Sequence, residues 1–302
     1  MPPRGGSIAS PPALPRGVPS WPRHPLHYER PLLLASVACV EEAALALRFP
    51  IGIIDLKDPR DGALGACRPE VWRTTAALRD RVAPQTLLSA ALGEIRVPGD
   101  ARRMASRATL AAHLGFDFVK VGLACAAATA EAALATVVAA SRSAAGEALR
   151  ARVIAVSCVD AAVQGVLRPM DLPLVASLGG ADGCLLDTAT KDGRSLTDHL
   201  SLEEAARFAG ECRGRGMIVA LAGSLGIGHL PRLVPLRPDV IGARGALCRE
   251  GREGRLDRGR LILFHDALRV ARRSIASAAS RDRQAAVAPG LDGAPVQRPT
   301  SR

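Results

Sequence analysis

The chain has 302 residues, of which 48% are hydrophobic and 3% are aromatic, and its formal net charge is +11. This length and hydrophobic content are typical of a globular protein with a large core, and no apolar run approaches the ~18 residues that a membrane span needs. The positive charge gathers at residues 1–31 (+3) and 269–302 (+5), and no RNA-recognition motif or zinc finger accompanies it, so the composition does not indicate a specific nucleic-acid binder.

The first segment, residues 1–31, is an Arg-bearing leader that holds nine of the 22 prolines. Proline at this density prevents a regular helix, so we expect the leader to be disordered. At the other end of the chain, residues 273–302 are rich in arginine and poor in large apolar residues. We expect them to form a disordered basic tail.

Eight short apolar runs alternate with longer Ala-rich segments between these ends. The runs have the composition of buried strands and occupy residues 32–38, 52–58, 86–93, 116–123, 152–160, 183–189, 217–224 and 239–247. Eight strand–helix units in about 240 residues predict a (β/α)8 TIM barrel over residues 32–272. The alternative, a doubly wound sheet, usually has a glycine-rich turn after its first strand, where this chain reads ACVEEA.

One of the helical segments also shows where it begins. Ser201 is followed three residues later by Glu204, and the apolar pattern of a helix starts between them. This spacing is typical of a capping box, in which the two side chains satisfy each other's backbone N–H groups. We therefore expect a helix that begins just after Ser201.

Lysine is rare in this chain, because 37 of its 40 basic residues are arginine and only Lys57, Lys120 and Lys191 are lysine. They belong to strands two, four and six, near the end of a barrel where active sites lie. Asp55 shares a strand face with Lys57, and Asp187 ends strand six. Since alternate strands contribute to the same interior layer, we expect these side chains to converge. The alternative is that each Asp–Lys pair is a buried ion pair that fixes a loop.

The choice of lysine over arginine has a chemical meaning. A lysine amine can lose its proton and attack a carbonyl carbon, whereas arginine stays protonated. Burial and neighbouring cations both lower the pKa of a lysine, which a Schiff-base nucleophile requires. The cluster therefore predicts carbonyl chemistry, such as aldol condensation, dehydration or isomerisation.

The last two strands carry a second element of the site. Gly223 and Ser224 follow strand seven, and Arg244 and Gly245 follow strand eight. Barrels often bind phosphate groups through backbone N–H groups at these positions. We therefore expect these four residues to bind a substrate phosphate, with tight turns made by the glycines as the alternative.

The chain resembles the (5-formylfuran-3-yl)methyl phosphate synthases, also called 4-(hydroxymethyl)-2-furancarboxaldehyde-phosphate synthases. The resemblance covers residues 32–265 and rests on IIDLKDPRDGALGA, FDFVKVGL, LLDTATKDGRSL, ALAGSL and GARGALC. It implies a TIM barrel that condenses two glyceraldehyde 3-phosphate molecules into a phosphorylated furan aldehyde for methanofuran-type cofactors, with loss of phosphate and water. It also implies that Lys57 forms the Schiff base, that Lys120 transfers protons, and that Asp55, Asp187 and Lys191 assist.

The residues leave two other functions open. The first is a different class I lyase or aldolase that uses its lysine on another aldehyde phosphate. The second is an inactive barrel that serves as a binding or scaffold subunit, although retention of three lysines in an arginine-rich chain speaks against it.

The remaining expectations concern location and partners. The seven cysteines form no CxxC pair and the six histidines no HExxH cluster, so neither a disulfide framework nor a metal site is indicated. Free cysteines favour the reducing cytoplasm. We expect no cofactor, a small-molecule substrate, no membrane or specific nucleic-acid partner, and a homo-oligomer.

Overall fold

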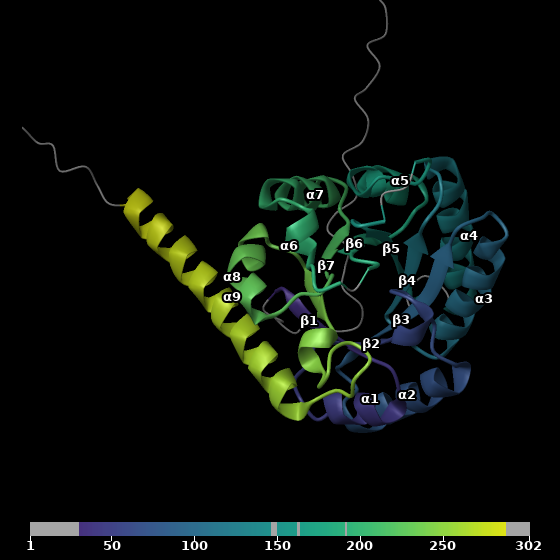
Figure 1. The fold of residues 1–302 in the computed structure, drawn as a ribbon, viewed down its shortest axis with the longest axis horizontal. Coiled ribbons are helices and arrows are strands. Elements are labelled where there is room, and N and C mark those ends of the chain that lie inside the picture. Colours follow the sequence, from purple (N-terminus) through teal and green to yellow (C-terminus); the bar gives the residue numbers. More distant parts are fainter. Residues whose placement is uncertain (1–29, 146–149, 162–163, 191, 288–302) are drawn as a thin grey trace, which may run out of the picture.

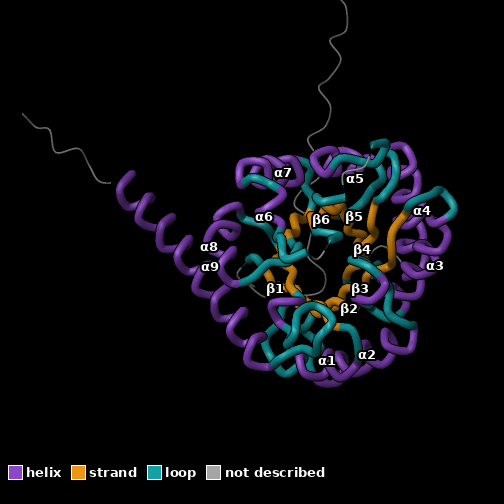
Figure 2. Tube along the Cα trace, viewed as in Figure 1, coloured by secondary structure: helices purple, strands orange, loops and turns teal. Residues whose placement is uncertain are grey.

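The structure, a computed structural model, describes residues 30–145, 150–161, 164–190 and 192–287. Within these ranges, eight parallel strands form one closed barrel in which each strand pairs with its neighbours in chain order and β1 pairs with β8. Figure 1 and Figure 2 look into this ring, and the helices surround it on the outside. The (β/α)8 fold and all eight expected strands are confirmed.

Strands and helices alternate along the chain. The strands are β1 (Leu32–Val37), β2 (Ile53–Leu56), β3 (Leu87–Ile95), β4 (Phe118–Leu123), β5 (Arg152–Cys158), β6 (Gly183–Asp187), β7 (Ile218–Leu221) and β8 (Val240–Ala243). The helices are α1 (Val40–Ala46), α2 (Pro69–Val82), α3 (Asp100–His113), α4 (Ala127–Ala145), α5 (Leu172–Leu178), α6 (Leu196–His199), α7 (Leu202–Gly214), α8 (Leu230–Leu233) and α9 (Arg258–Val287). Two short 3-10 turns follow strands at the site, η1 (Pro59–Asp61) after β2 and η5 (Gly245–Leu247) after β8.

The strands are largely apolar on both faces, because one face packs inside the barrel and the other packs against the helices. Leu34, Ile53 and Phe118 belong to the cluster inside the barrel. Their neighbours along the strands, such as Leu33 and Ile54, belong to the larger cluster that packs against the helices. This arrangement explains why the strands read as continuous apolar runs rather than as alternating ones.

The start of α7 follows the expected capping box. The hydroxyl of Ser201 accepts the backbone N–H of Glu204 at 3.2 Å, and the carboxylate of Glu204 accepts the backbone N–H of Ser201 at 2.9 Å. The two bonds satisfy N–H groups that the first turn of a helix leaves without partners. The predicted beginning of this helix is confirmed.

The last helix, α9, closes the barrel after β8 and continues beyond it. Leu261, Phe264 and Leu268 are buried against the barrel's outer layer. The expected domain end at residue 272 falls inside α9, because the Ala- and Arg-rich sequence beyond it still favours helix. Figure 1 shows the final turns extending away from the barrel.

The other parts of the expected tails, residues 1–29 and 288–302, lie outside the described residues. Residues 273–287, which we expected to be disordered, are drawn as the last turns of α9. None of the helices in the described part of the chain has the length and apolar character that crossing a bilayer requires.

Candidate active site

A cavity of about 720 Å³ opens at the C-terminal ends of the barrel strands, and this volume is typical of small-molecule sites. Most residues that the sequence singled out line it: Lys57, Lys120, Asp187, Gly223, Ser224, Arg244 and Gly245. Asp55 is fully buried in contact with Lys120, and Lys191 lies outside the described residues. Across the described residues, no group of three His, Cys, Asp or Glu side chains is placed to hold a metal ion.

The loop after β2 explains the glycines of the IIDLKDPRDGALGA block. Asp58 caps η1 by accepting the backbone N–H of Arg60 at 3.0 Å, and its own N–H donates to the carbonyl of Gly65 at 2.9 Å. Gly62 has a φ of +81°, a conformation that favours glycine. A Cβ on Gly65 would lie 2.4 Å from the Asp58 carbonyl oxygen. The loop therefore folds tightly back on itself beside Lys57.

Replacing Gly65 with alanine is expected to destabilise this loop. The added Cβ would also lie 2.5 Å from the carbonyl oxygen of Asp61, so the backbone must move. Overpacking of this kind costs about 1–3 kcal/mol, which lowers the Tm of a chain this size by roughly 2–12 °C. The control is Gly99→Ala, because a Cβ at Gly99 meets nothing within 4 Å. Equal Tm values for the two variants would show that the loop relaxes freely.

Asp55 and Lys120 form a buried ion pair inside the barrel. Lys120 Nζ lies 2.6 Å from Asp55 Oδ2, and the two side chains are 4% and 0% exposed. The hydroxyls of Ser36 and Ser89 donate to the same carboxylate at 2.9 and 2.8 Å. The strand register explains these bonds, because Ser36, Asp55 and Ser89 lie opposite one another on β1, β2 and β3. Lys120 reaches Asp55 because β2 and β4 contribute to the same interior layer.

The pKa of Asp55 lies below its ordinary value in spite of its burial. Burial has the largest single influence and raises this pKa. The charges of Lys120 and Lys57, together with hydrogen bonds from Lys120 and Ser89, lower it by more in total. Asp55 is therefore an anion at neutral pH and neutralises one of the two amines beside it.

Lys57 is the other amine, and no described carboxylate pairs with it as Asp55 pairs with Lys120. Its side chain lines the cavity and is buried, and within the described part of the chain its amine forms no hydrogen bond or ion pair. Burial lowers the pKa of Lys57 to about 8, with Asp187 raising the pKa and Lys120 lowering it. A minor but usable fraction of the amine is therefore neutral near pH 7, as nucleophilic attack on a carbonyl requires.

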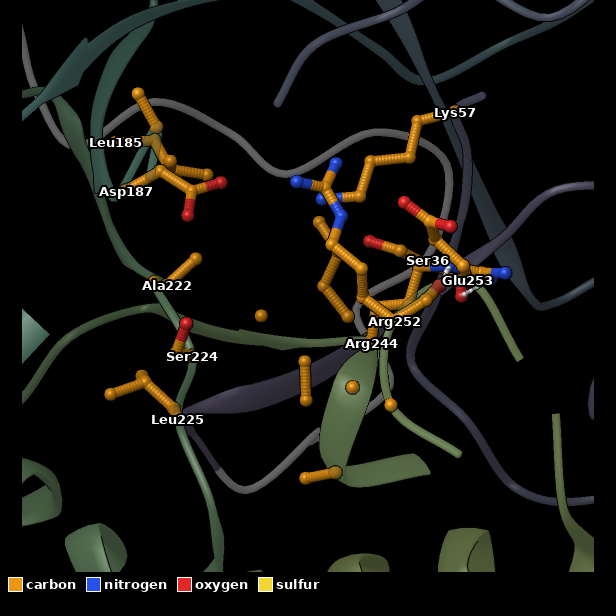
Figure 3. Close-up of a pocket in the computed structure, with 18 of the residues that line it drawn as sticks. Ser36, Lys57, Leu185, Asp187, Ala222, Ser224, Leu225, Arg244, Arg252 and Glu253 are labelled. Carbon is orange, nitrogen blue, oxygen red and sulfur yellow. Dashed lines mark hydrogen bonds between the residues drawn. The ribbon is translucent and has the colours of Figure 1, made fainter. Parts of the chain in front are cut away.

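Asp187 places a carboxylate across the cavity from Lys57 (Figure 3). It ends β6, is 4% exposed, and accepts the backbone N–H of Thr188 at 2.7 Å. The loop that follows is held by Asp160, whose two carboxylate oxygens accept the N–H groups of Ala189 and Thr190, each at 2.6 Å. Asp187 is thus a fixed carboxylate that can take or return a proton close to the amine.

The ends of β7 and β8 supply backbone N–H groups to the cavity. Gly223 and Ser224 both have positive φ values, +99° and +51°, which turn the chain sharply after β7. Such strain in a serine is tolerated mainly at functional positions. Among the backbone hydrogen bonds of the described residues, none uses the N–H of Ser224 or Gly245. These groups remain candidates for binding an anion.

The side chain of Arg244 is fully engaged in hydrogen bonds to the protein. Its Nε donates to the carbonyl of Arg252 at 2.6 Å, and its Nη1 donates to the carbonyl of Ser36 at 3.0 Å and to Glu42 at 2.9 Å. Its Nη2 donates to Glu42 at 3.5 Å and to the carbonyl of Gly254 at 3.3 Å. All five N–H groups of the guanidinium are therefore occupied. Arg244 holds the loop after β8 in place and has no side-chain donor left for a phosphate.

The sequence does not single out three polar residues of the site, Ser36, Ser89 and Arg252. A signal for the two serines exists, because each lies an even number of residues from an inward leucine on its strand, Leu34 or Leu87. Arg252 has no such signal, since arginine is the common basic residue of this chain. Only the fold brings Arg252 into the cavity.

Known proteins of similar sequence and structure exist. The family model described as 4-HFC-P synthase matches residues 33–263. The (5-formylfuran-3-yl)methyl phosphate synthase of Methanococcus maripaludis strain C6 is 38% identical over 231 residues, which cover 75% of this chain and 94% of that protein. The synthase of the same name from Methanothermobacter thermautotrophicus strain Delta H is 36% identical over 240 residues, covering 79% and 96%. A solved structure of 3-hexulose-6-phosphate synthase shares the fold, with a TM-score of 0.54 and 18% identity over 80% of this chain and 99% of that one.

Proposed function

Because the chain belongs to the 4-HFC-P synthase family, we propose that it condenses two molecules of glyceraldehyde 3-phosphate into (5-formylfuran-3-yl)methyl phosphate, with loss of phosphate and water. The reaction runs through a Schiff base on Lys57, and its product serves the synthesis of methanofuran-type cofactors. The observation that carries this proposal is the buried Lys57 amine, which has no hydrogen-bond or ion-pair partner among the described residues and whose pKa of about 8 suits a nucleophile at the end of a barrel strand.

The reaction begins when the neutral amine of Lys57 attacks the aldehyde carbon of one substrate. Loss of water from the resulting carbinolamine gives the imine, which acidifies the hydrogen on the next carbon. Asp187 takes that proton, because it is the carboxylate that faces Lys57 in the cavity. The imine thus converts an unreactive carbon into one that can form or break a neighbouring bond.

Lys120 acts as the proton-transfer residue, assisted by Asp55. Its ammonium lines the cavity and is held 2.6 Å from Asp55 Oδ2. From this position Lys120 passes a proton to a hydroxyl that leaves as water. Ser36 and Ser89 hold the carboxylate in one orientation, which fixes the position of the ammonium.

The retained phosphate binds at the ends of β7 and β8. The N–H groups of Ser224 and Gly245 line that side of the cavity, and they are free of backbone partners within the described ranges. Backbone N–H groups suit a phosphate oxygen because they donate without the cost of ordering a long side chain.

The test is to incubate the purified chain with glyceraldehyde 3-phosphate and to follow furan absorbance and released phosphate together. We expect both to appear with one phosphate per furan. Unphosphorylated glyceraldehyde is the control, and it should give neither signal. Phosphate release without a furan would instead indicate another class I lyase, and an inert protein that binds the substrate would indicate a scaffold.

A further inference from the structure

The proposed reaction brings two phosphate groups into one cavity, and only one of them is retained in the product. This inference rests on that proposed function and concerns the phosphate that leaves. A departing phosphate accumulates negative charge as its bond to carbon breaks, so it needs a cation close to the reacting carbon. The question is which residue supplies that cation.

Four cationic side chains line the cavity among the described residues, Lys57, Lys120, Arg244 and Arg252. Lys57 forms the imine in the proposed reaction and cannot serve as a phosphate-binding cation at the same time. Lys120 is paired with Asp55 at 2.6 Å, and all five donors of Arg244 are occupied. Arg252 is left.

The guanidinium of Arg252 retains most of its donors. Its Nη2 donates to the carbonyl of Gly62 at 2.6 Å, which is its one hydrogen bond to the described residues. Four of its five N–H groups therefore have no partner in the described part of the chain and can bind a ligand. Figure 3 shows its side chain reaching into the cavity between Asp187 and Lys57. The bond to Gly62 also anchors it to the loop that follows the strand of Lys57.

The turn that carries Arg252 is built to hold one conformation. Glu250 and Gly251 both have positive φ values, +60° and +83°, and the N–H of Arg249 donates to the carbonyl of Arg255 at 2.9 Å. A Cβ on Gly254 would lie 1.6 Å from the Arg249 carbonyl oxygen, so only glycine fits there. A non-glycine residue at positive φ costs free energy, which proteins tolerate mainly where function requires the geometry.

A hydrogen bond from Arg244 also holds the backbone of Arg252. Its carbonyl accepts the Nε–H of Arg244 at 2.6 Å, and Arg244 is itself held by Glu42. The side chain is thus anchored at its backbone by Arg244 and at its tip by Gly62. A guanidinium fixed in this way can bind an anion without first losing the freedom of a flexible side chain.

We propose that Arg252 binds the phosphate that leaves the substrate held on Lys57, and that this subsite is distinct from the one at Ser224 and Gly245. Asp187 removes a proton from the carbon next to the imine. The electron pair of that C–H bond forms a carbon–carbon double bond to the third carbon, and the C–O bond to phosphate breaks with its electrons on the phosphate oxygen. The proton passes from Asp187 to the phosphate, and Arg252 balances the charge that develops.

The test compares Arg252→Gln with Arg255→Gln, which removes the same charge from an exposed position on the same turn. Each variant is mixed with glyceraldehyde 3-phosphate and borohydride, and the mass of the adduct on Lys57 is measured. In Arg252→Gln we expect phosphate release to slow by about 10- to 100-fold, as for loss of a hydrogen bond to a charged group. The adduct that still carries phosphate should accumulate, while Arg255→Gln behaves as the unaltered chain does.

Three outcomes decide the inference. Unchanged release in Arg252→Gln, with the unaltered Tm, would overturn it. Equal slowing of adduct formation and of release would also overturn it, because Arg252 would then assist formation of the imine and not the departure of the phosphate. Partial recovery of release in Arg252→Lys, with the adduct unchanged, would support it, since a cation would be restored without the guanidinium geometry.

Failure of the proposed function would look different. In that case the unaltered chain and Arg255→Gln would release no phosphate either. Titration with inorganic phosphate then tests the subsite alone. Weaker binding by Arg252→Gln than by Arg255→Gln supports the anion site, and equal binding overturns it.

Discussion

Replacing Lys57 with arginine is expected to abolish imine formation and to lower turnover by more than about 10³-fold. Arginine keeps the positive charge and most of the length of the side chain. It remains protonated in proteins, however, and cannot supply the lone pair that attacks the aldehyde carbon. The measurement is borohydride reduction in the presence of glyceraldehyde 3-phosphate, followed by mapping of the modified residue. A triose-derived mass should appear on Lys57 of the unaltered chain and be missing from the variant.

The pH dependence of trapping checks the same assignment. With the pKa of Lys57 at about 8, about one tenth of the amine is neutral at pH 7. The rate of adduct formation should therefore rise with pH and level off above about pH 8, well below the ordinary lysine value of 10.5. A rate that still climbs at pH 10, or label on Lys120 or Lys191, would show that another amine forms the imine.

Much of this site follows from the sequence because it depends on local pattern. The eight apolar runs mark the strands, and parallel strands of a barrel all end at the same face. A lysine or aspartate near such an end therefore lies near the others whatever the details of packing. That is why the sequence pattern alone predicts that Lys57, Lys120 and Asp187 line one cavity, as they do.

The remaining features depend on contacts that no local pattern contains. Arg244 follows a strand, as a phosphate-binding residue would, but its side-chain donors are taken by three backbone carbonyls and by Glu42, which lies 202 residues earlier on α1. Arg252 lies in a loop, and one more arginine does not stand out in this arginine-rich chain. It reaches the cavity because Arg244 holds its backbone carbonyl and the carbonyl of Gly62 holds its guanidinium. Sequence pattern places a side chain on a strand or loop, whereas packing decides which groups form hydrogen bonds with that side chain.

The buried pair of Asp55 and Lys120 should show the largest effect on stability. Replacing Asp55 with alanine leaves the Lys120 ammonium in a site that is 4% exposed, with no opposite charge at 2.6 Å. Removing one partner of such a pair typically costs about 3–5 kcal/mol. Urea unfolding at neutral pH measures this loss. The control is Asp171→Ala, which breaks an ion pair of similar length, 2.7 Å, whose side chains are 80% and 41% exposed. Solvent screens such a pair, so its loss should cost far less than that of Asp55.

A double variant separates the lost charge from the lost volume. In Asp55→Ala with Lys120→Met, no buried ammonium remains, and Met fills the space of the lysine stem with apolar atoms. We expect the double variant to recover most of the free energy of unfolding. The attraction between the two charges roughly equals the cost of removing them from water, so the pair itself adds little net stability. It should nevertheless be inactive, since the proton-transfer amine is gone. If the double variant is as unstable as Asp55→Ala alone, the cost lies in the bonds from Ser36 and Ser89 and not in the unpaired charge.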